Sequence, residues 1–193
     1  MELLLIRHAR PERIENADGS PADPPLDASG REQAERLAAW LADEKLDRIY
    51  ASHLRRARET ATPLLSGRGL ELELEPRVAE FDRHSDTYVP LEQLKAEDPE
   101  AWRVFVQGGY GDGLDFEGFC RDVVGGLEAI VETNPGCRVA VVCHGGVINI
   151  WTAHVLALPL RLFFQPDYAS IHRYVAARSG ERSIDALNER PRG

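Results

Sequence analysis

Short apolar runs alternate along the chain with longer amphipathic segments, and this alternation gives the first indication of the fold. The run of apolar residues at 3–6 and the Val-Ala-Val-Val run at 139–142 are typical of strands buried on both faces. The pattern predicts strands over 3–6, 46–51, 70–74, 138–143 and 170–176. The segments between them predict one helix that ends near residue 43. They predict further helices over 54–65, 90–106, 116–132 and 147–158. Strands that alternate with helices indicate an α/β sandwich with a mostly parallel sheet.

Glycine, proline and capping residues mark the ends of these elements. The stretch 11–29 carries Asp-Gly-Ser-Pro and Asp-Pro-Pro sequences, which predict a loop. Asp27 or Ser29 can cap the helix that follows. The glycine-rich stretch 108–113 predicts a flexible break between two helical segments. No repeat or long linker divides the chain, so we expect one domain over residues 1–193.

The composition is that of an ordinary folded domain. Hydrophobic residues make up 43% of the 193 residues and charged residues 28%, which excludes the disordered and fibrous classes. No apolar run approaches the ~20 residues that span a bilayer, and the first residues do not resemble a signal peptide. The three cysteines form neither a disulfide framework nor a metal-ligand spacing. We therefore expect a reduced, cytoplasmic protein that does not enter a membrane.

Acidic residues outnumber basic ones, with one local exception. The net charge of −9 and a pI near 5.2 argue against non-specific binding to nucleic acid or to a membrane surface. Residues 48–58, however, contain arginines and no acid, whereas 71–100 is strongly acidic. Charge runs usually form solvated faces, so the residues around these arginines decide whether they do more. The sequence leaves the oligomeric state open, a homodimer included.

Polar residues directly follow three of the predicted strands. Arg7-His8 follows the first strand, 52–58 follows the second, and His144-Gly145-Gly146 follows the strand at 138–143. Ligands bind beyond the carboxyl ends of parallel strands, so we expect these residues to converge at one edge of the sheet. Arginine binds phosphate oxygens with two donors, and glycines at a helix N-terminus let an anion approach backbone N–H groups. Because a neutral imidazole can attack phosphorus, the arrangement predicts a phosphate pocket with a histidine nucleophile.

Four sequence blocks lie in order between residues 5 and 147. They are Leu5-Ile6-Arg7-His8, then 25–34 (Pro-Leu-Asp-Ala-Ser-Gly-Arg-Glu-Gln-Ala), 52–61 (Ser-His-Leu-Arg-Arg-Ala-Arg-Glu-Thr-Ala) and 142–147 (Val-Cys-His-Gly-Gly-Val). Together they resemble the histidine phosphatase superfamily, which includes the cofactor-dependent phosphoglycerate mutases. The resemblance implies a three-layer α/β/α sandwich with a small helical lid over about 82–116. It also implies phosphoryl transfer through a phosphohistidine, without a metal ion or other cofactor.

The resemblance assigns roles to residues at the strand ends. His8 matches the nucleophile, and Arg7 matches its phosphate-binding neighbour. The arginine of the Ser-x-Leu-x-Arg-Ala block falls on Arg56, while Arg55 and Arg58 are expected at the surface. His144 matches the second histidine, which would hold a phosphate oxygen and stabilise charge in the transition state. Gly145, which follows it, is expected to bind phosphate as well.

The proton donor is the least sharply matched residue. Glu80 lies where the family has a glutamate that protonates the leaving alkoxide and then activates water. The mutases follow this glutamate with Arg and a Tyr-Gly pair, whereas this chain has Phe81-Asp82-Arg83-His84. This difference weakens the support for a mutase and makes Asp82 a rival proton donor.

Two further positions depart from the family pattern. Ala9 follows the nucleophile where the family usually has glycine, and alanine would be strained there if the turn required a positive φ. Ile14 stands where the family often has a phosphate-lining asparagine, and Asn16 lies two residues later. The sequence does not decide whether Asn16 reaches the phosphate site.

Three other functions stay open. A metallohydrolase would use the two histidines and nearby carboxylates, although the adjacent arginines would repel a divalent cation. A non-catalytic domain would bind a phospholigand without turnover. A mutase would need a substantial lid to keep water from the phosphohistidine, and only 35 residues lie between Glu80 and Phe116. We therefore predict an open pocket in which water is the acceptor, so that a phosphomonoester is hydrolysed.

The remaining aromatic, histidine and cysteine residues receive structural roles. We expect Trp40, Trp102 and Trp151 in the core rather than as platforms for a ligand. Cys143 is expected to face away from His144, because neighbours on a strand point to opposite sides. The other histidines are expected to be structural or at the surface: His53, His84, His154 and His172. The aromatic residues of the lid segment form either pocket walls or core: Tyr88, Trp102 and Phe105. The sequence does not identify the substrate.

Overall fold

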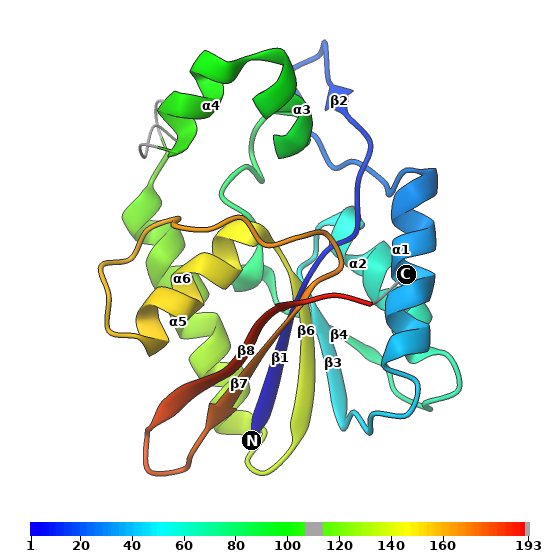
Figure 1. Cartoon of the computed structure of the whole chain (residues 1–193), viewed down its shortest axis with the longest axis vertical. Helices are drawn as coiled ribbons and strands as arrows, with labels where there is room; N and C mark the ends of the chain where they lie inside the picture. The colour runs from blue at the N-terminus through cyan, green and yellow to red at the C-terminus, as the bar shows by residue number, and fades with distance from the viewer. Residues whose placement is uncertain (107–113, 192–193) are drawn as a thin grey trace.

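A computed structural model of the protein describes residues 1–106 and 114–191, and its main body is a six-stranded sheet between two layers of helices (Figure 1). The strand order is β4-β3-β6-β1-β7-β8. In that order the strands are Leu72–Leu74, Arg48–Ala51, Arg138–Cys143, Glu2–Arg7, Ile171–Ala176 and Arg182–Glu189. The described helices are α1 (Ala28–Trp40), α2 (Arg55–Ala61), α3 (Leu91–Glu97), α4 (Pro99–Val106), α5 (Phe116–Thr133) and α6 (Gly145–Val155). Two short 3-10 helices are η1 (Thr62–Leu65) and η2 (Pro76–Val78).

The sheet is mixed but mostly parallel. Strands β4, β3, β6 and β1 are parallel to one another, whereas β7 is antiparallel to both β1 and β8. All strands of this sheet except β7 therefore run in the same direction, and the predicted α/β sandwich is confirmed.

Each face of the sheet buries its own apolar cluster, because the side chains of a strand point alternately to opposite sides. On β1, Leu3 and Leu5 pack with residues of α5 and α6, whereas Leu4 and Ile6 pack with residues of α1 and α2. Full burial of such a side chain stabilises the fold by about 1.5–3 kcal/mol. Since β1 also pairs with β6 along its whole length, the ends of these two strands are held firmly in place.

Helices α3 and α4 lie beyond the carboxyl ends of the strands (Figure 1). A second, two-stranded sheet of β2 (Ile14–Glu15) and β5 (Thr87–Tyr88) lies in the same region. An Arg13–Glu97 ion pair of 2.9 Å connects the chain before β2 to the end of α3. This region includes the segment predicted as a lid, 82–116, but the predicted glycine-rich break at 108–113 lies outside the described residues.

Several boundaries differ from those predicted. Helix α1 ends at Trp40, which is 37% exposed rather than in the core. The helix expected over 54–65 becomes 3-10 near Pro63, which has no N–H for an α-helical hydrogen bond. The helix expected over 90–106 is interrupted at Asp98, because a residue before proline avoids helical geometry. Strand β8 follows the strand predicted to be the last, and its many polar residues hide it in the sequence.

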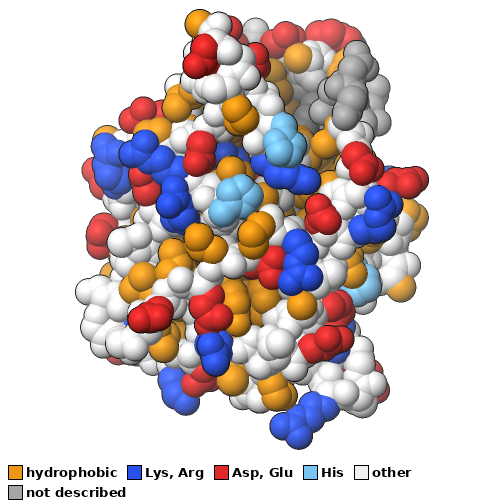
Figure 2. All heavy atoms as spheres, turned by 180° about the vertical axis from the view of Figure 1, so that it is seen from behind, with side chains coloured by type: hydrophobic (Ala, Val, Ile, Leu, Met, Phe, Trp, Pro, Cys, Tyr) orange, Lys and Arg blue, Asp and Glu red, His pale blue; other side chains and the backbone are white. Residues whose placement is uncertain are grey.

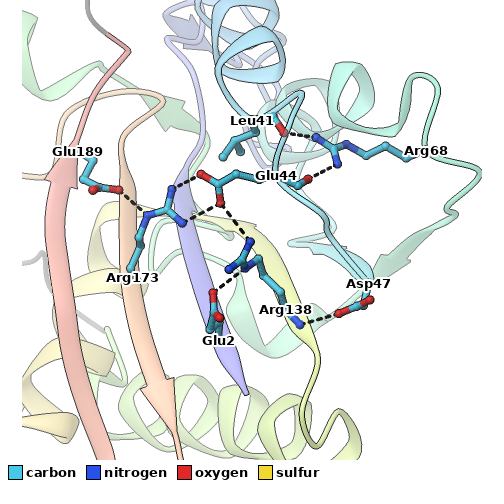
Figure 3. Close-up of polar contacts among 8 residues, drawn as sticks. All are labelled: Glu2, Leu41, Glu44, Asp47, Arg68, Arg138, Arg173 and Glu189. Carbon is cyan, nitrogen blue, oxygen red and sulfur yellow. Dashed lines mark hydrogen bonds and ion pairs between the residues drawn. The ribbon is translucent and has the colours of Figure 1, made fainter.

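A network of ion pairs fastens the loop after α1 to the sheet (Figure 3). Arg173 on β7 donates two hydrogen bonds to the Glu44 carboxylate, of 2.9 and 2.6 Å, and a third to Glu189 on β8. Arg68 donates to the Glu44 carbonyl oxygen at 2.6 Å. Hydrogen bonding to Arg173 lowers the pKa of Glu44, so the carboxylate is the form that the folded protein favours.

Charges of both signs cover the surface. Figure 2 shows the face opposite to that in Figure 1, and acidic and basic side chains alternate there with apolar ones. The net charge of −9 therefore does not gather into one continuous acidic patch on this face. Within the described residues, no helix combines the length and the apolar character needed to cross a bilayer.

Candidate active site

Three neighbouring strands end at the same edge of the sheet and carry the candidate residues there. Strand β1 ends at Arg7, and the His8 N–H donates to the Cys143 carbonyl at the end of β6 (2.9 Å). The chain after β3 leads into α2, whose second residue is Arg56. Because β3, β6 and β1 are adjacent, the predicted convergence of these residues is observed.

His8 is held as a neutral imidazole with one nitrogen available. The side chain is 3% exposed, and Nδ1 lies 2.8 Å from the Ala9 carbonyl oxygen. A carbonyl oxygen only accepts, so Nδ1 carries the proton and Nε2 keeps its lone pair. Burial, and then the charges of Arg56 and Arg7, hold the pKa of His8 well below its usual value. Ala9 does not adopt a positive φ, so this turn does not require a glycine.

Two buried guanidinium groups flank His8. Arg7 donates to the Pro166 carbonyl oxygen (2.5 Å) and stacks on the Tyr168 ring, 3.9 Å from its centroid. Arg56 donates one hydrogen bond to Asp82 (2.8 Å) and lies over the Tyr88 ring. The Nε atom of Arg7, and Nε and Nη1 of Arg56, have no hydrogen-bond partner within the part of the chain that the structure describes.

His144 completes this group of cationic and imidazole side chains. It is the N-terminal cap of α6, and its ring centroid lies 5.0 Å from that of His8. The side chain is fully buried, and neither ring nitrogen has a hydrogen-bond partner among the described residues. Burial, together with Arg56 and His8, lowers the pKa of His144. A buried polar atom without a partner is costly, and a bound oxyanion would remove that cost for His144 and both arginines.

Glu80 lies against the N-terminus of α6. One carboxylate oxygen accepts from the Gly146 N–H at 2.8 Å, and the other accepts from the Phe81 N–H at 3.2 Å. Burial, and then repulsion from Asp82, raise the pKa of Glu80 to about 7. A carboxyl group with this pKa can serve both as an acid and as a base near neutral pH. A Cβ at position 146 would lie 2.1 Å from the Glu80 carboxylate, so this close approach requires a glycine.

Asp82, the rival proton donor, forms an ion pair with Arg56. Both carboxylates line the same cavity, but only Glu80 receives backbone hydrogen bonds from the start of α6. The geometry therefore favours Glu80 as proton donor and Asp82 as a partner that fixes Arg56.

A cavity of about 720 Å³ opens over this group. Its wall includes Arg7, His8, Arg56, Glu80 and the glycines of 145–146, while His144 contacts His8 from outside the wall. The loop 161–166 also contributes to the wall, which could not be predicted because the loop matches no motif. Tyr168, which stacks on Arg7, is another residue that the sequence did not reveal.

Other predicted residues lie elsewhere. The Asn16 amide donates to the Ser20 and Pro21 carbonyl oxygens and does not line the cavity. Arg55, Arg58, His53 and His84 are exposed, as expected, and Cys143 and Trp151 are buried in the core. Tyr88 and Trp102 line the cavity, whereas the side chain of Phe105 lies outside the described residues.

The described part of the chain does not contain the ligand set that a metallohydrolase would need. Among the described residues, no three or more histidine, cysteine, aspartate or glutamate side chains are grouped in a way that could hold a metal ion. The two guanidinium groups beside His8 would also repel a divalent cation.

The chain is similar to a known protein family, to proteins of known sequence and to solved structures. A family model described as histidine phosphatase superfamily (branch 1) matches residues 3–190. The adenosylcobalamin/alpha-ribazole phosphatase of Escherichia coli K12 is 32% identical over 166 residues, which cover 82% of this chain and 81% of that protein. A probable phosphoglycerate mutase of Cronobacter sakazakii is 29% identical over 171 residues, with coverages of 82% and 76%. The crystal structure of the alpha-ribazole phosphatase from Shigella flexneri matches with a TM-score of 0.76 at 27% identity, covering 100% of this chain and 98% of that one.

Proposed function

Because the chain belongs to the histidine phosphatase superfamily, we propose that it hydrolyses phosphomonoesters of small molecules through a phosphohistidine on His8. The observation that carries this proposal is the set of buried nitrogens without partners on Arg7, Arg56 and His144, which surround the imidazole of His8. A tetrahedral phosphate would accept hydrogen bonds from the guanidinium nitrogens and from the one protonated ring nitrogen of His144. In this proposal residues 1–193 act as one domain, with about 82–116 as its lid.

In the first step, the phosphoryl group moves from the substrate to His8. The free Nε2 lone pair attacks phosphorus while the bond from phosphorus to the alcohol oxygen breaks. Arg7 and Arg56 neutralise the phosphate oxygens, and His144 donates a hydrogen bond where charge develops. Glu80 gives its proton to the leaving alkoxide, and such proton transfer contributes about 10²–10⁴-fold.

In the second step, water removes the phosphoryl group. The Glu80 carboxylate formed in the first step takes a proton from water, whose oxygen attacks phosphorus. The bond between phosphorus and His8 breaks, and inorganic phosphate leaves. Since burial raises the pKa of Glu80 to about 7, both of its protonation states are available near neutral pH.

Mutase activity is the alternative within the same family, and several relatives are named as probable phosphoglycerate mutases. The position that follows Phe81 holds Asp82, which binds Arg56, rather than a residue free to grip a sugar acid. We therefore propose that water, and not a second sugar acid, accepts the phosphoryl group.

A panel of phosphomonoesters assayed on the wild type and on His8→Ala tests the function. We expect release of inorganic phosphate by the wild type only, insensitive to EDTA and blocked by vanadate, which mimics the transferring phosphoryl group. Isomerisation of 3-phosphoglycerate faster than phosphate release would establish the mutase instead. Tight binding of phosphate esters without turnover of any of them would establish a non-catalytic binding domain.

A further inference from the structure

The cavity changes character with distance from His8. Its inner end holds the charged groups of the phosphate site, whereas the rest of the wall is largely apolar. One side of this wall comes from Phe81, Leu94 and Trp102. The loop 161–166 provides Leu162, Phe163 and Phe164. At about 720 Å³, the space lies within the roughly 300–1,000 Å³ typical of pockets for drug-sized ligands, so a phosphate group alone would not fill it.

Most polar side chains of the outer wall are already hydrogen-bonded within the protein. The Asn149 amide donates to the carbonyl oxygens of Gly145 and Phe164 and accepts from the N–H groups of Phe163 and Phe164, at 2.8–3.0 Å. These bonds use the donors and acceptors of this amide and fix the aromatic side of the wall. Gln165 donates to Glu92 on α3 at 3.1 Å.

Polar side chains on the other side of the cavity are also hydrogen-bonded within the protein. Ser85 donates to the Thr87 carbonyl oxygen and accepts from the Thr87 N–H. The Thr87 hydroxyl lies 3.1 Å from Asp86. Arg161, the remaining cation of the outer wall, is exposed to solvent. Among described wall residues, the buried side-chain atoms without a hydrogen-bond partner belong to Arg7 and Arg56.

This contrast determines which alcohols the site can recognise. Among the described residues of the outer wall, spare polar side-chain groups belong to the exposed Arg161 and Gln165. The hydroxyl groups of a sugar or a sugar acid would lose water and stay unpaired wherever they are buried against the aromatic part of the wall. Burial against the same wall stabilises bound apolar groups. Resting on the proposed function, we infer that the substrates are phosphomonoesters of bulky apolar alcohols, aromatic or long-chain. The phosphate would lie at His8, and the apolar part between Trp102 and the loop 161–166.

A series of n-alkyl phosphates from ethyl to hexyl tests this inference. Their leaving alcohols have nearly the same acidity, so differences in kcat/KM report the binding of the alkyl chain. Burial of each methylene is expected to raise kcat/KM about fourfold, which gives about 200-fold from ethyl to hexyl phosphate. Glycerol phosphate and 3-phosphoglycerate should react no faster than ethyl phosphate.

Variants of the wall locate the effect. Trp102→Ala is expected to lower kcat/KM for hexyl phosphate at least tenfold more than kcat/KM for ethyl phosphate. Trp40→Ala is the matched control, because Trp40 lies at the end of α1 and does not line the cavity. Phe163→Ala is expected to act like Trp102→Ala, and its matched control is Leu158→Ala. Leu158 is exposed and lies in the same segment between α6 and β7, but it does not line the cavity.

The outcomes separate the inference from the proposed function. A rise in kcat/KM with chain length that Trp102→Ala and Phe163→Ala reduce supports the inference. Hydrolysis that depends on His8 but does not increase with chain length overturns the inference and leaves the proposed function intact. The same conclusion follows if glycerol phosphate reacts faster than hexyl phosphate. Absence of hydrolysis of every ester, p-nitrophenyl phosphate included, overturns the proposed function itself.

Discussion

Replacement of Glu80 by glutamine tests how the buried carboxyl group contributes to the reaction. The change removes the proton that the leaving alkoxide needs, while glutamine keeps the shape of the side chain. For ethyl phosphate, whose alkoxide is a poor leaving group, we expect kcat/KM to fall about 10²–10⁴-fold. For p-nitrophenyl phosphate, which needs little protonation, we expect kcat/KM within about fivefold of the wild type. Its kcat should still fall, because Glu80 also activates water in the second step.

The pH profile of the wild type measures the contribution of the Glu80 proton to kcat/KM independently of the variant. With the pKa of Glu80 at about 7, half of the carboxyl groups are protonated at pH 7 and about 1% at pH 9. The kcat/KM for ethyl phosphate should therefore decline about fiftyfold between these pH values. The decline should be absent with p-nitrophenyl phosphate, whose leaving group needs little protonation, so this ester serves as the control.

Unfolding by urea provides a second measurement on the same variant. Folding raises the pKa of Glu80, so this carboxyl group favours the folded state below pH 4.5, and that stability is lost as the pH rises through about 7. The loss in the wild type is about 3 kcal/mol and should be absent in Glu80→Gln. Equal losses of kcat/KM on both esters, or a pH profile that Glu80→Gln leaves unchanged, would refute the assignment of Glu80 as proton donor.

Three further predictions follow from contacts at and away from the site. Asp82→Asn removes a negative charge that raises the pKa of Glu80, so the alkaline decline of kcat/KM for ethyl phosphate should begin at lower pH; an unchanged profile would argue against this coupling. Gly146→Ala would place a Cβ 2.1 Å from the Glu80 carboxylate, and kcat/KM for ethyl phosphate should fall at least tenfold while that for p-nitrophenyl phosphate is retained. Glu44→Gln weakens the bonds to Arg173 and should lower the free energy of unfolding at pH 7 by about 1–2 kcal/mol. The pKa of Glu44 is lowered in the folded protein, so its contribution is present above pH 4.5 and lost as the pH falls through that lowered pKa; denaturation curves of variant and wild type should therefore converge in acid.

The strands and the inner end of the site could be predicted because their signals are local. Apolar runs such as 138–143 identify central strands without reference to the rest of the chain, and parallel strands bring their carboxyl ends to one edge. Arg7, His8, Arg56 and His144 therefore come together as the sequence indicates. The position of Glu80 was suggested by the family pattern, but its hydrogen bond to Gly146 and its raised pKa depend on tertiary contacts.

The outer wall could not be predicted, because it depends on contacts between distant segments. Asn149 gives no sign in the sequence that its amide holds the backbone of Phe163 and Phe164. Strand β8 was missed because only one of its faces packs on the body, so its sequence is largely polar. Trp40 was assigned to the core by residue type alone, but it lies in the exposed part of the last turn of α1, while Leu37 and Leu41 occupy the buried side.

Identification of the phosphorylated residue tests the central claim most directly. Glu80→Gln should accumulate the covalent intermediate, because it slows the reaction with water more than the transfer from p-nitrophenyl phosphate. After rapid mixing with this ester and quenching in base, mass spectrometry of peptides should find one acid-labile phosphoryl group, located on His8. A phosphoryl group on another residue, or phosphate release by His8→Ala at the wild-type rate, would contradict the account.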